Sequence, residues 1–133
     1  MIDYILKHDD NMLYIVDNQE LIIKDQTFQK YVNSFLIKRL TNLQALEKMT
    51  KKHFCFKSKI PLYIDRETLL LCIFSYRTQK SIYINYFSIN KYHSVTDGVT
   101  ISFLNGHEMK IPNYKGFLSQ LKKAREILNT IEY

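Results

Sequence analysis

The fold is decided by one stretch, Phe103-Leu104-Asn105-Gly106-His107-Glu108-Met109-Lys110-Ile111-Pro112, which runs on into Asn113-Tyr114-Lys115-Gly116-Phe117-Leu118-Ser119-Gln120. Apolar residues alternate with polar ones on both sides of Asn105-Gly106, which is the pattern of a β-hairpin. A two-residue loop would place the two apolar rows on opposite faces, so we predict a three-residue loop at residues 104–106. This register pairs Ile101 with Met109 and requires a left-handed conformation at Gly106.

The residues after the hairpin predict an amphipathic helix near the C-terminus. Pro112 ends the strand and Asn113 is a suitable N-cap. Apolar residues then recur at three- and four-residue spacing, which is typical of a helix with one buried face. This stripe consists of Tyr114, Phe117, Leu118, Leu121, Ala124, Leu128 and Ile131. We expect its row of Phe117, Leu121, Ala124 and Leu128 to pack on an antiparallel sheet.

The first half of the chain predicts strands followed by a helix. Residues 4–6, 12–16 and 21–23 are short apolar runs separated by turns rich in Asp and Asn, which suggests an antiparallel meander. From Thr27 to Met49 the apolar residues follow the helical period, and neither Gly nor Pro interrupts residues 27–59. We therefore predict a long central helix that ends near Lys52, either continuous or broken near Thr41-Asn42.

Residues 60–89 are again typical of strands, because β-branched and aromatic residues dominate them. Two runs, 69–76 and 81–89, are apolar on both faces and should be covered on both, with residues 77–80 as the turn between them. The whole chain, 1–133, is thus expected to be one α+β domain. Its parts are an antiparallel sheet made of the meander and the hairpin, the long central helix and the C-terminal helix.

The net charge of +6 is unevenly distributed along the chain. Residues 1–29 carry −4, residues 30–59 carry +7 and residues 60–133 carry +3. A concentrated positive segment is expected of a surface that meets a polyanion, although a solvated basic helix would give the same pattern. Within this segment, Lys48, Lys51 and Lys52 have the spacing that places side chains on one helical face.

Motifs for catalysis, metal binding or membrane insertion are not found in the sequence. Three scattered glycines cannot form a phosphate-binding loop, and the four histidines lack metal-ligand spacing, so we expect no cofactor. Cys55 and Cys72 form no Cys-x-x-Cys pair and are expected to be reduced core thiols. The N-terminus is unlike a signal peptide, and the longest near-apolar run, residues 69–74, is too short to cross a bilayer. We expect a cytoplasmic protein.

Several pieces of sequence, in their order and spacing, resemble the ComK family of competence transcription factors. They are Lys59-Ile60-Pro61-Leu62-Tyr63-Ile64-Asp65, Tyr83-Ile84-Asn85-Tyr86-Phe87-Ser88-Ile89, the hairpin residues Phe103, Asn105, Gly106, Met109 and Pro112, and the helix residues Phe117, Gln120 and Lys123. The chain departs from the family pattern at residues 38–48, which lack the usual Cys and Gly, and at Tyr83, where members tend to have Trp.

The resemblance implies a bacterial activator that reads paired AT-rich boxes of double-stranded DNA in the minor groove and acts as an oligomer. Typical members continue into a tail that a proteolytic adaptor recognises. This chain stops just past the last helix, so the resemblance implies an adaptor partner only weakly.

Under this hypothesis we expect the main DNA contacts to come from the central basic segment, where Lys48, Lys51 and Lys52 would track phosphates. Arg39 is the better minor-groove candidate, because guanidinium is more weakly hydrated than ammonium. The complete set of expected contacts is Lys38, Arg39, Lys48, Lys51 and Lys52, with Arg77 and Lys80 as secondary candidates.

Two other classes of function remain open from the sequence. One is a protein-interaction module or a paralogue that heteromerises with a full-length regulator. The other is a peripheral binder of phospholipid headgroups on a pleckstrin-homology-like scaffold. A contiguous basic stripe would favour DNA, a compact basic pocket at a barrel mouth would favour lipid, and scattered lysines would favour the interaction module.

Overall fold

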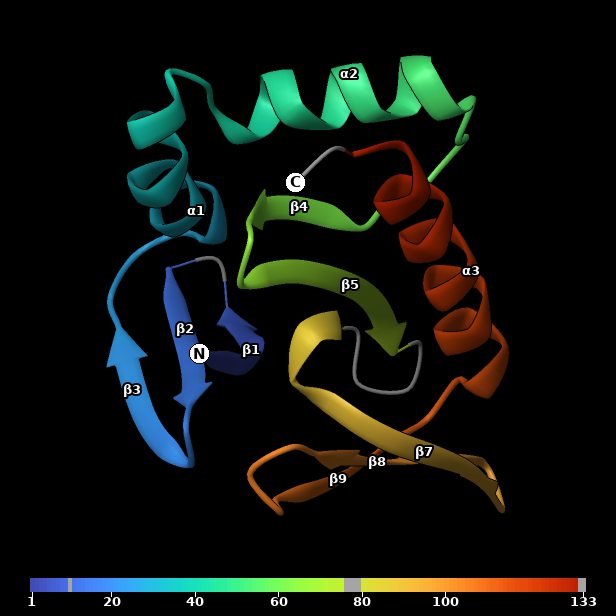
Figure 1. Ribbon diagram of the computed structural model, residues 1–133. Coiled ribbons are helices and arrows are strands. Elements are labelled where there is room, and N and C mark those ends of the chain that lie inside the picture. The colour runs from blue at the N-terminus through green and yellow to red at the C-terminus, as the bar shows by residue number, and fades with distance from the viewer. Residues whose placement is uncertain (10, 76–79, 132–133) are drawn as a thin grey trace.

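The computed structural model describes residues 1–9, 11–75 and 80–131, and they form two antiparallel sheets with helices at their margin (Figure 1). The larger sheet has the strand order β3-β2-β1-β6-β5-β4, and the smaller one has the order β7-β8-β9. The strands are β1 (Ile2–Asp9), β2 (Met12–Asp17), β3 (Glu20–Lys24), β4 (Leu62–Asp65), β5 (Thr68–Ser75), β6 (Lys80–Asn85), β7 (Ile89–Val95), β8 (Gly98–Phe103) and β9 (Glu108–Ile111). The expected α+β class and the N-terminal meander β1-β2-β3 are confirmed, but the meander and the hairpin β8-β9, which were expected in one sheet, lie in different sheets.

The prediction of one long central helix is wrong. The region contains α1 (Phe28–Leu36), a 3₁₀ turn η1 (Ile37–Arg39) and α2 (Leu43–Phe54). Leu40 follows η1 in a left-handed conformation, with a φ of 56°, and ends the run formed by α1 and η1. Asn42 then begins α2, because its side chain accepts a hydrogen bond from the backbone N–H of Ala45. The break lies where the alternative prediction placed it, so the local preference of Asn for an N-cap prevails over the continuous apolar period.

The expected strand over residues 81–89 is also interrupted. β6 ends at Asn85, and residues Tyr86–Ser88 form a 3₁₀ turn, η2, before β7 begins. The Asn85 side chain accepts from the backbone N–H of Phe87, which starts the turn and moves the chain from the larger sheet to the smaller one. Both apolar runs of the sequence nevertheless contribute to the core.

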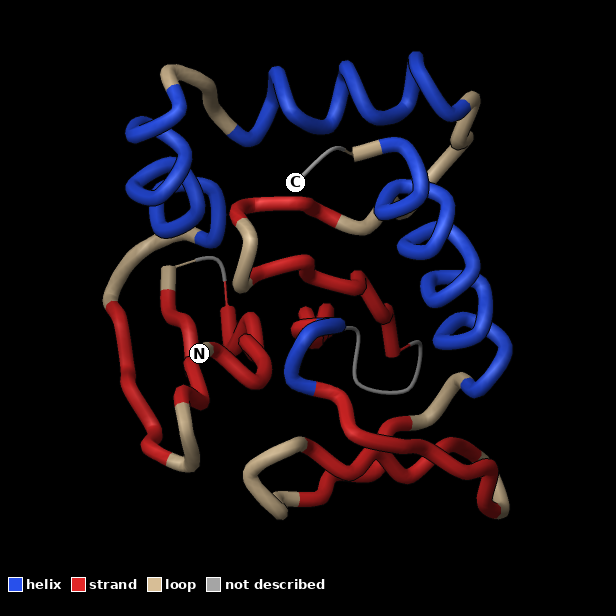
Figure 2. Tube along the Cα trace, viewed as in Figure 1, coloured by secondary structure: helices blue, strands red, loops and turns tan. Residues whose placement is uncertain are grey.

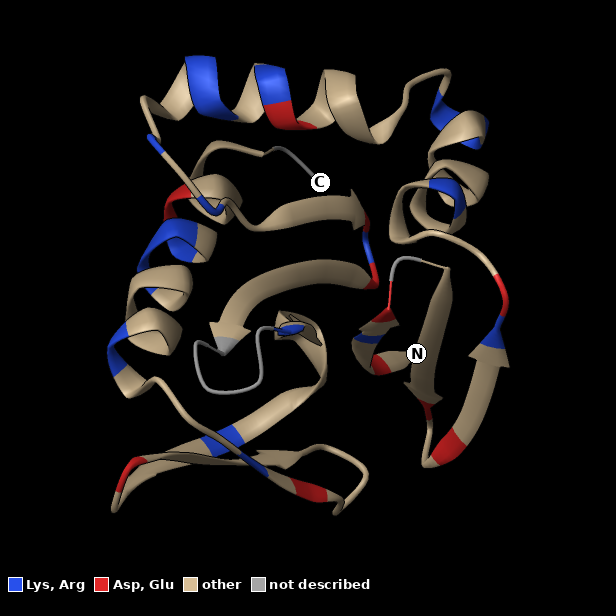
Figure 3. Ribbon diagram, turned by 180° about the vertical axis from the view of Figure 1, so that it is seen from behind, with Lys and Arg blue, Asp and Glu red and all other residues tan. Residues whose placement is uncertain are grey.

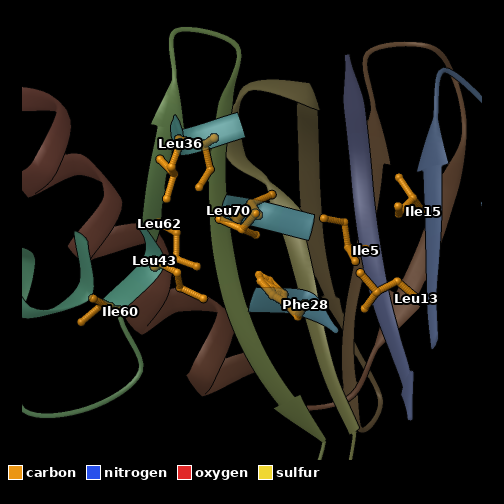
Figure 4. Packing of buried hydrophobic residues seen from close by; sticks show 11 residues of the cluster. Ile5, Leu13, Ile15, Phe28, Leu36, Leu43, Ile60, Leu62 and Leu70 are labelled. Carbon is orange, nitrogen blue, oxygen red and sulfur yellow. The ribbon is translucent and has the colours of Figure 1, made fainter. Parts of the chain in front are cut away.

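β5 lies between two apolar clusters, as its two apolar faces predict. Leu70 points into the first cluster, which joins the larger sheet to α1 and α2 (Figure 4). Leu69, Leu71 and Ile73 lie in the second cluster, which joins the larger sheet to the smaller sheet and to α3 (Tyr114–Thr130). In Figure 2, α1 lies at the upper left, α2 runs along the top and α3 lies on the right, while the smaller sheet lies at the bottom.

The C-terminal helix packs as predicted, with one shift in its buried row. Asn113 caps α3 by accepting from the N–H of Gly116, and Phe117, Leu121 and Ala124 are buried against β5 and β8. Ile127 is buried as well, whereas Leu128 is only half-buried against the cluster. Because a helix has 3.6 residues per turn, residues spaced by three and four do not stay on the same face along its whole length. At the end of α3 the buried position is therefore Ile127 and not Leu128.

The hairpin has the predicted three-residue loop. Ile101 pairs with Met109, and Phe103 and His107 are joined by a backbone hydrogen bond of 2.8 Å. Gly106 has a φ of +92°. The loop also joins the two sheets, because the Asn105 amide donates to the carboxylate of buried Asp3 at 2.7 Å.

We expect Gly106→Ala to lower the free energy of unfolding by about 1 kcal/mol, because a Cβ is disfavoured at positive φ. No atom lies within 4 Å of the position of that Cβ, so the cost is conformational rather than steric. Urea unfolding measures it, with Gly106→Asn as the comparison, since Asn tolerates the left-handed region better. Equal stability of the Ala variant and the parent would contradict this explanation.

Candidate nucleic-acid interface

Positive charge gathers on the helices and on the segment between α2 and β4. Residues 28–61 and 114–130 hold twelve of the nineteen Lys and Arg but only two of the thirteen Asp and Glu. Figure 3 shows this from behind, with Lys and Arg on α1, α2 and α3 and with Asp and Glu mainly at strand ends and turns. The helices therefore present the surface that is best suited to a polyanion.

α2 carries three of the predicted contacts. It lies across the top of the molecule in Figure 1, and Leu43 is its one buried residue. Lys48, Lys51 and Lys52 all fall within this single helix and are all exposed, so they share a face as predicted. Glu47 is the one acidic residue on α2. This face is suited to following a phosphate backbone, because nearly all of its charge is positive.

Arg39 is held in a fixed position at the end of η1. Its Nη1 donates to the backbone carbonyl of Ile64 at 2.7 Å, and its guanidinium lies 5.4 Å from the centre of the Tyr63 ring. A guanidinium has five N–H donors, so further donors remain for another acceptor. Lys38, the other predicted contact in this turn, is exposed. Arg39 thus both stabilises the junction with β4 and presents an oriented cation.

The two secondary candidates are separate from α2. Lys80 is exposed at the start of β6, where it pairs with Ser75 at the end of β5, and β4 lies between α2 and β5 (Figure 1). Arg77 lies outside the described residues. The structure therefore brings together the predicted cations of η1 and α2 along one side of the molecule, and it places Lys80 elsewhere.

A second group of lysines extends the α2 surface and was missed among the expected contacts. The C-terminal part of α3 meets the segment after α2, because Lys123 Nζ donates to the carbonyls of Ser58 (2.9 Å) and Lys59 (3.1 Å). Lys57 and Lys122 are exposed at this corner. We define the basic helical surface as Lys48, Lys51, Lys52, Lys57 and Lys122. The helical stripe places Lys122 on the solvent side, but the sequence alone does not reveal that α3 meets the segment after α2.

Gln120 explains why α3 takes this position. It is buried, and its side chain joins two distant segments, accepting from the N–H of Cys72 at 2.9 Å and donating to the carbonyl of Lys59 at 2.7 Å. Lys59 itself has a φ of 35°, and its ammonium lies 4.6 Å from the centre of the Phe74 ring. These contacts fix the corner between α2 and α3 on which the basic helical surface depends.

Comparison with known proteins shows to which family the chain belongs. The family model described as ComK protein matches residues 3–132, nearly the whole chain. The chain belongs to the ComK family. No curated protein and no solved structure matches it. At the level of the family, membership supports a competence transcription factor, which is a class of regulator and not of enzyme.

The residues by which the chain resembles the ComK family are mainly architectural. Asn105 and Gly106 shape the hairpin loop, and Phe117 and Gln120 attach α3 to the sheet. Lys59 supplies a carbonyl that accepts hydrogen bonds from two side chains of α3. The family pattern therefore identifies the scaffold, whereas the basic helical surface lies largely outside it.

Among the described residues, no three His, Cys, Asp or Glu side chains are grouped so that they could hold a metal ion. Within the same part of the chain, no helix is long and apolar enough to span a membrane.

The two cysteines differ from each other, and the prediction of a core thiol is wrong for Cys55. Cys55 is exposed, and it is the C-cap of α2. Its backbone is left-handed, as is common where a helix ends. Cys72 is half-buried and lines a cavity of about 140 Å³ beside Tyr83 and Lys59. Burial raises the pKa of the Cys72 thiol, and the nearby Lys59 partly offsets this.

We expect the native protein to react with a disulfide reagent in two phases, a fast one from Cys55 and a much slower one from Cys72. The thiolate is the reactive form, and burial reduces both its population at Cys72 and the access of the reagent. Stopped-flow absorbance should lose the fast phase in Cys55→Ser and keep it in Cys72→Ser. Two equally fast thiols in the folded protein would show that Cys72 is not protected.

Proposed function

We propose that this member of the ComK family is a DNA-binding transcriptional regulator that reads AT-rich boxes through minor-groove and phosphate contacts. The observation that carries the proposal is the face of α2 formed by Lys48, Lys51 and Lys52. Lys57 and Lys122 extend it around the corner to α3. Such an extended arrangement fits a duplex better than a compact headgroup pocket. The proposed action is cytoplasmic and requires no cofactor.

The proposed contacts divide into two kinds. The basic helical surface binds phosphates, which supplies affinity for any sequence. Arg39 enters the narrow minor groove of AT-rich DNA, where the negative potential is concentrated, and Lys38 accompanies it. Lys80, at the start of β6, and Arg77 act as secondary phosphate contacts. Arg39 suits its role because its bond to Ile64 and its contact with Tyr63 already restrict its rotamers.

Fluorescence anisotropy with two labelled duplexes, one with paired AT-rich boxes and one GC-rich, tests this function. We expect binding to both, tighter binding to the AT-rich duplex, and a linear fall of the logarithm of affinity with the logarithm of salt concentration. A minor-groove ligand such as distamycin should displace the protein from the AT-rich duplex. A folded protein with no salt-dependent affinity for either duplex would overturn the proposal.

Replacing Arg39 tests the minor-groove contact separately. We expect Arg39→Lys to reduce the ratio of AT-rich to GC-rich affinity by about ten-fold, while the salt slope stays nearly unchanged. The charge is retained, but the flat, weakly hydrated guanidinium is lost. Thermal unfolding controls for the lost bond to Ile64. An unchanged affinity ratio in a folded variant would place the groove contact elsewhere.

A specific observation also favours the interaction module as a second candidate. Three apolar side chains are strongly exposed near the lysines of η1 and α2, namely Ile37 (64% exposed), Leu40 (92%) and Met49 (73%). Apolar groups among cations suit an acidic protein partner with apolar anchors. Under this alternative, Leu40→Ser and Met49→Ser would abolish capture of the partner, and duplex affinity would be absent.

A further inference from the structure

β3 is an open edge of the larger sheet. It pairs with β2 on one side only, and in Figure 1 it lies at the outer margin with no strand or helix beyond it. Two of its five residues are large, apolar and mostly exposed, Leu21 at 61% and Ile23 at 56%. An edge of this kind is a template for pairing with another strand.

The turn before β3 determines which backbone groups face the open edge. β2 and β3 are joined by Asn18 and Gln19, which both have positive φ, 51° and 72°, as in a two-residue type I′ turn. In such a hairpin the pair next to the turn, Asp17 and Glu20, exchanges both hydrogen bonds, and the bonding direction then alternates along the strand. The N–H and C=O groups of Leu21 and Ile23 therefore point away from β2.

The opposite edge of the same sheet is protected. In β4 the side chains of Leu62 and Ile64 are buried, and the carbonyl of Ile64 accepts from Arg39. No hydrogen bond within the described part of the chain engages Leu21 or Ile23 in a comparable way. The two edges thus differ: β4 is covered by the protein's own side chains, and β3 has both its bonding groups and its apolar side chains accessible.

We infer that β3 is an interaction surface for a second copy of this chain, which adds its own β3 in antiparallel orientation. Pairing centred on Ile22 places Leu21 opposite Ile23 of the second copy, so that the outward bonding groups of both strands meet. The same register places Glu20 opposite Lys24 of the second copy, and Lys24 opposite its Glu20. A shift of two residues along the strand would lose both charge pairs, so the charges select this register.

The geometry of this pairing has a consequence for the whole assembly. The two strands are related by a two-fold axis through the Ile22 pair, which makes the contact isologous. That axis is perpendicular to the joined sheet, so both copies place the same face on the same side. Ile22 packs in the cluster of α1, and α1 of each copy therefore lies on one common face. This interface does not depend on DNA binding and can be tested without DNA.

Analytical ultracentrifugation of the protein alone tests the interface through its charges. We expect a concentration-dependent dimer for the parent and at least about ten-fold weaker association for Glu20→Lys and for Lys24→Glu, because each change opposes like charges twice. An equimolar mixture of the two variants should regain association, because the Lys pair of one copy then faces the Glu pair of the other. Circular dichroism controls for folding, and both positions are exposed.

A second variant tests the backbone contact. Ile23→Pro removes an N–H that points to the open edge and none that bonds β2, so the fold should persist while the dimer is lost. Three results would overturn the inference: a parent that stays monomeric up to about 1 mM, single charge variants that associate like the parent, or a mixture that does not regain association. A monomeric parent would leave the edge available to a different chain.

Discussion

Replacing Lys48, Lys51 and Lys52 together by alanine should weaken binding to every duplex by about 100-fold at about 0.1 M salt. Each lysine that meets a phosphate releases about one counterion, so the slope of log affinity against log salt should fall by about 2 to 3. The preference for the AT-rich duplex should remain, because Arg39 is unchanged and phosphates carry no sequence information. Anisotropy titrations over a range of salt concentrations measure both quantities.

The matched control removes three positive charges from elsewhere. Arg66, Lys91 and Lys110 are exposed on the β4–β5 turn, β7 and β9, and none of them belongs to the basic helical surface. We expect their triple alanine variant to keep most of the affinity and nearly the full salt slope. Equal losses in the two triple variants would show that only the net charge matters, and the basic helical surface would then not be the contact.

The parts of the fold that were predicted correctly depend on local chemistry. The three-residue hairpin loop follows from the alternation of residues 99–111 and from Gly106, and both act over a few positions. The start of α3 follows from Asn113, and its buried face follows from the helical stripe. These elements could be predicted because each is specified by the residues that form it.

The errors arose where a single polar side chain overrides a longer pattern. Asn42 begins a new helix inside a continuous apolar period, and Asn85 ends a strand inside a continuous apolar run. β7 was not predicted at all, because Ile89–Val95 is mostly polar and half-exposed and shows little strand pattern of its own. It forms by pairing with β8, and such long-range pairing is invisible in the sequence of β7 alone.

The candidate site was predicted in part for a related reason. Lys48, Lys51 and Lys52 could be grouped from spacing within one helix, whereas Lys122 joins them only through the packing of α3. That packing depends on Gln120, whose side chain forms hydrogen bonds with the backbone of Cys72 and of Lys59, both far away in the sequence. A surface built from two helices requires the tertiary contacts that place those helices.

Replacing Asn85 by alanine should destabilise the protein by at least about 3 kcal/mol, a large part of the 5–15 kcal/mol typical of a domain. Asn85 is fully buried, and each of its bonding positions is occupied. Its carbonyl oxygen accepts from the N–H groups of Leu69 and Phe87, and its amide donates to the carbonyls of Ile2 and Glu67. Alanine would leave several of these groups buried without a partner, and each such loss costs about 1–3 kcal/mol.

The same four bonds explain why the effect should extend beyond β6. They join β1, the β4–β5 turn and η2, where the chain crosses from the larger sheet to the smaller one. We therefore expect the melting temperature to fall by more than about 10 °C. Asn90→Ala is the matched control, because Asn90 is exposed on β7 and should change stability by less than about 0.5 kcal/mol. If Asn85→Ala were as stable as this control, the junction between the sheets would be held by apolar packing rather than by the Asn85 side chain.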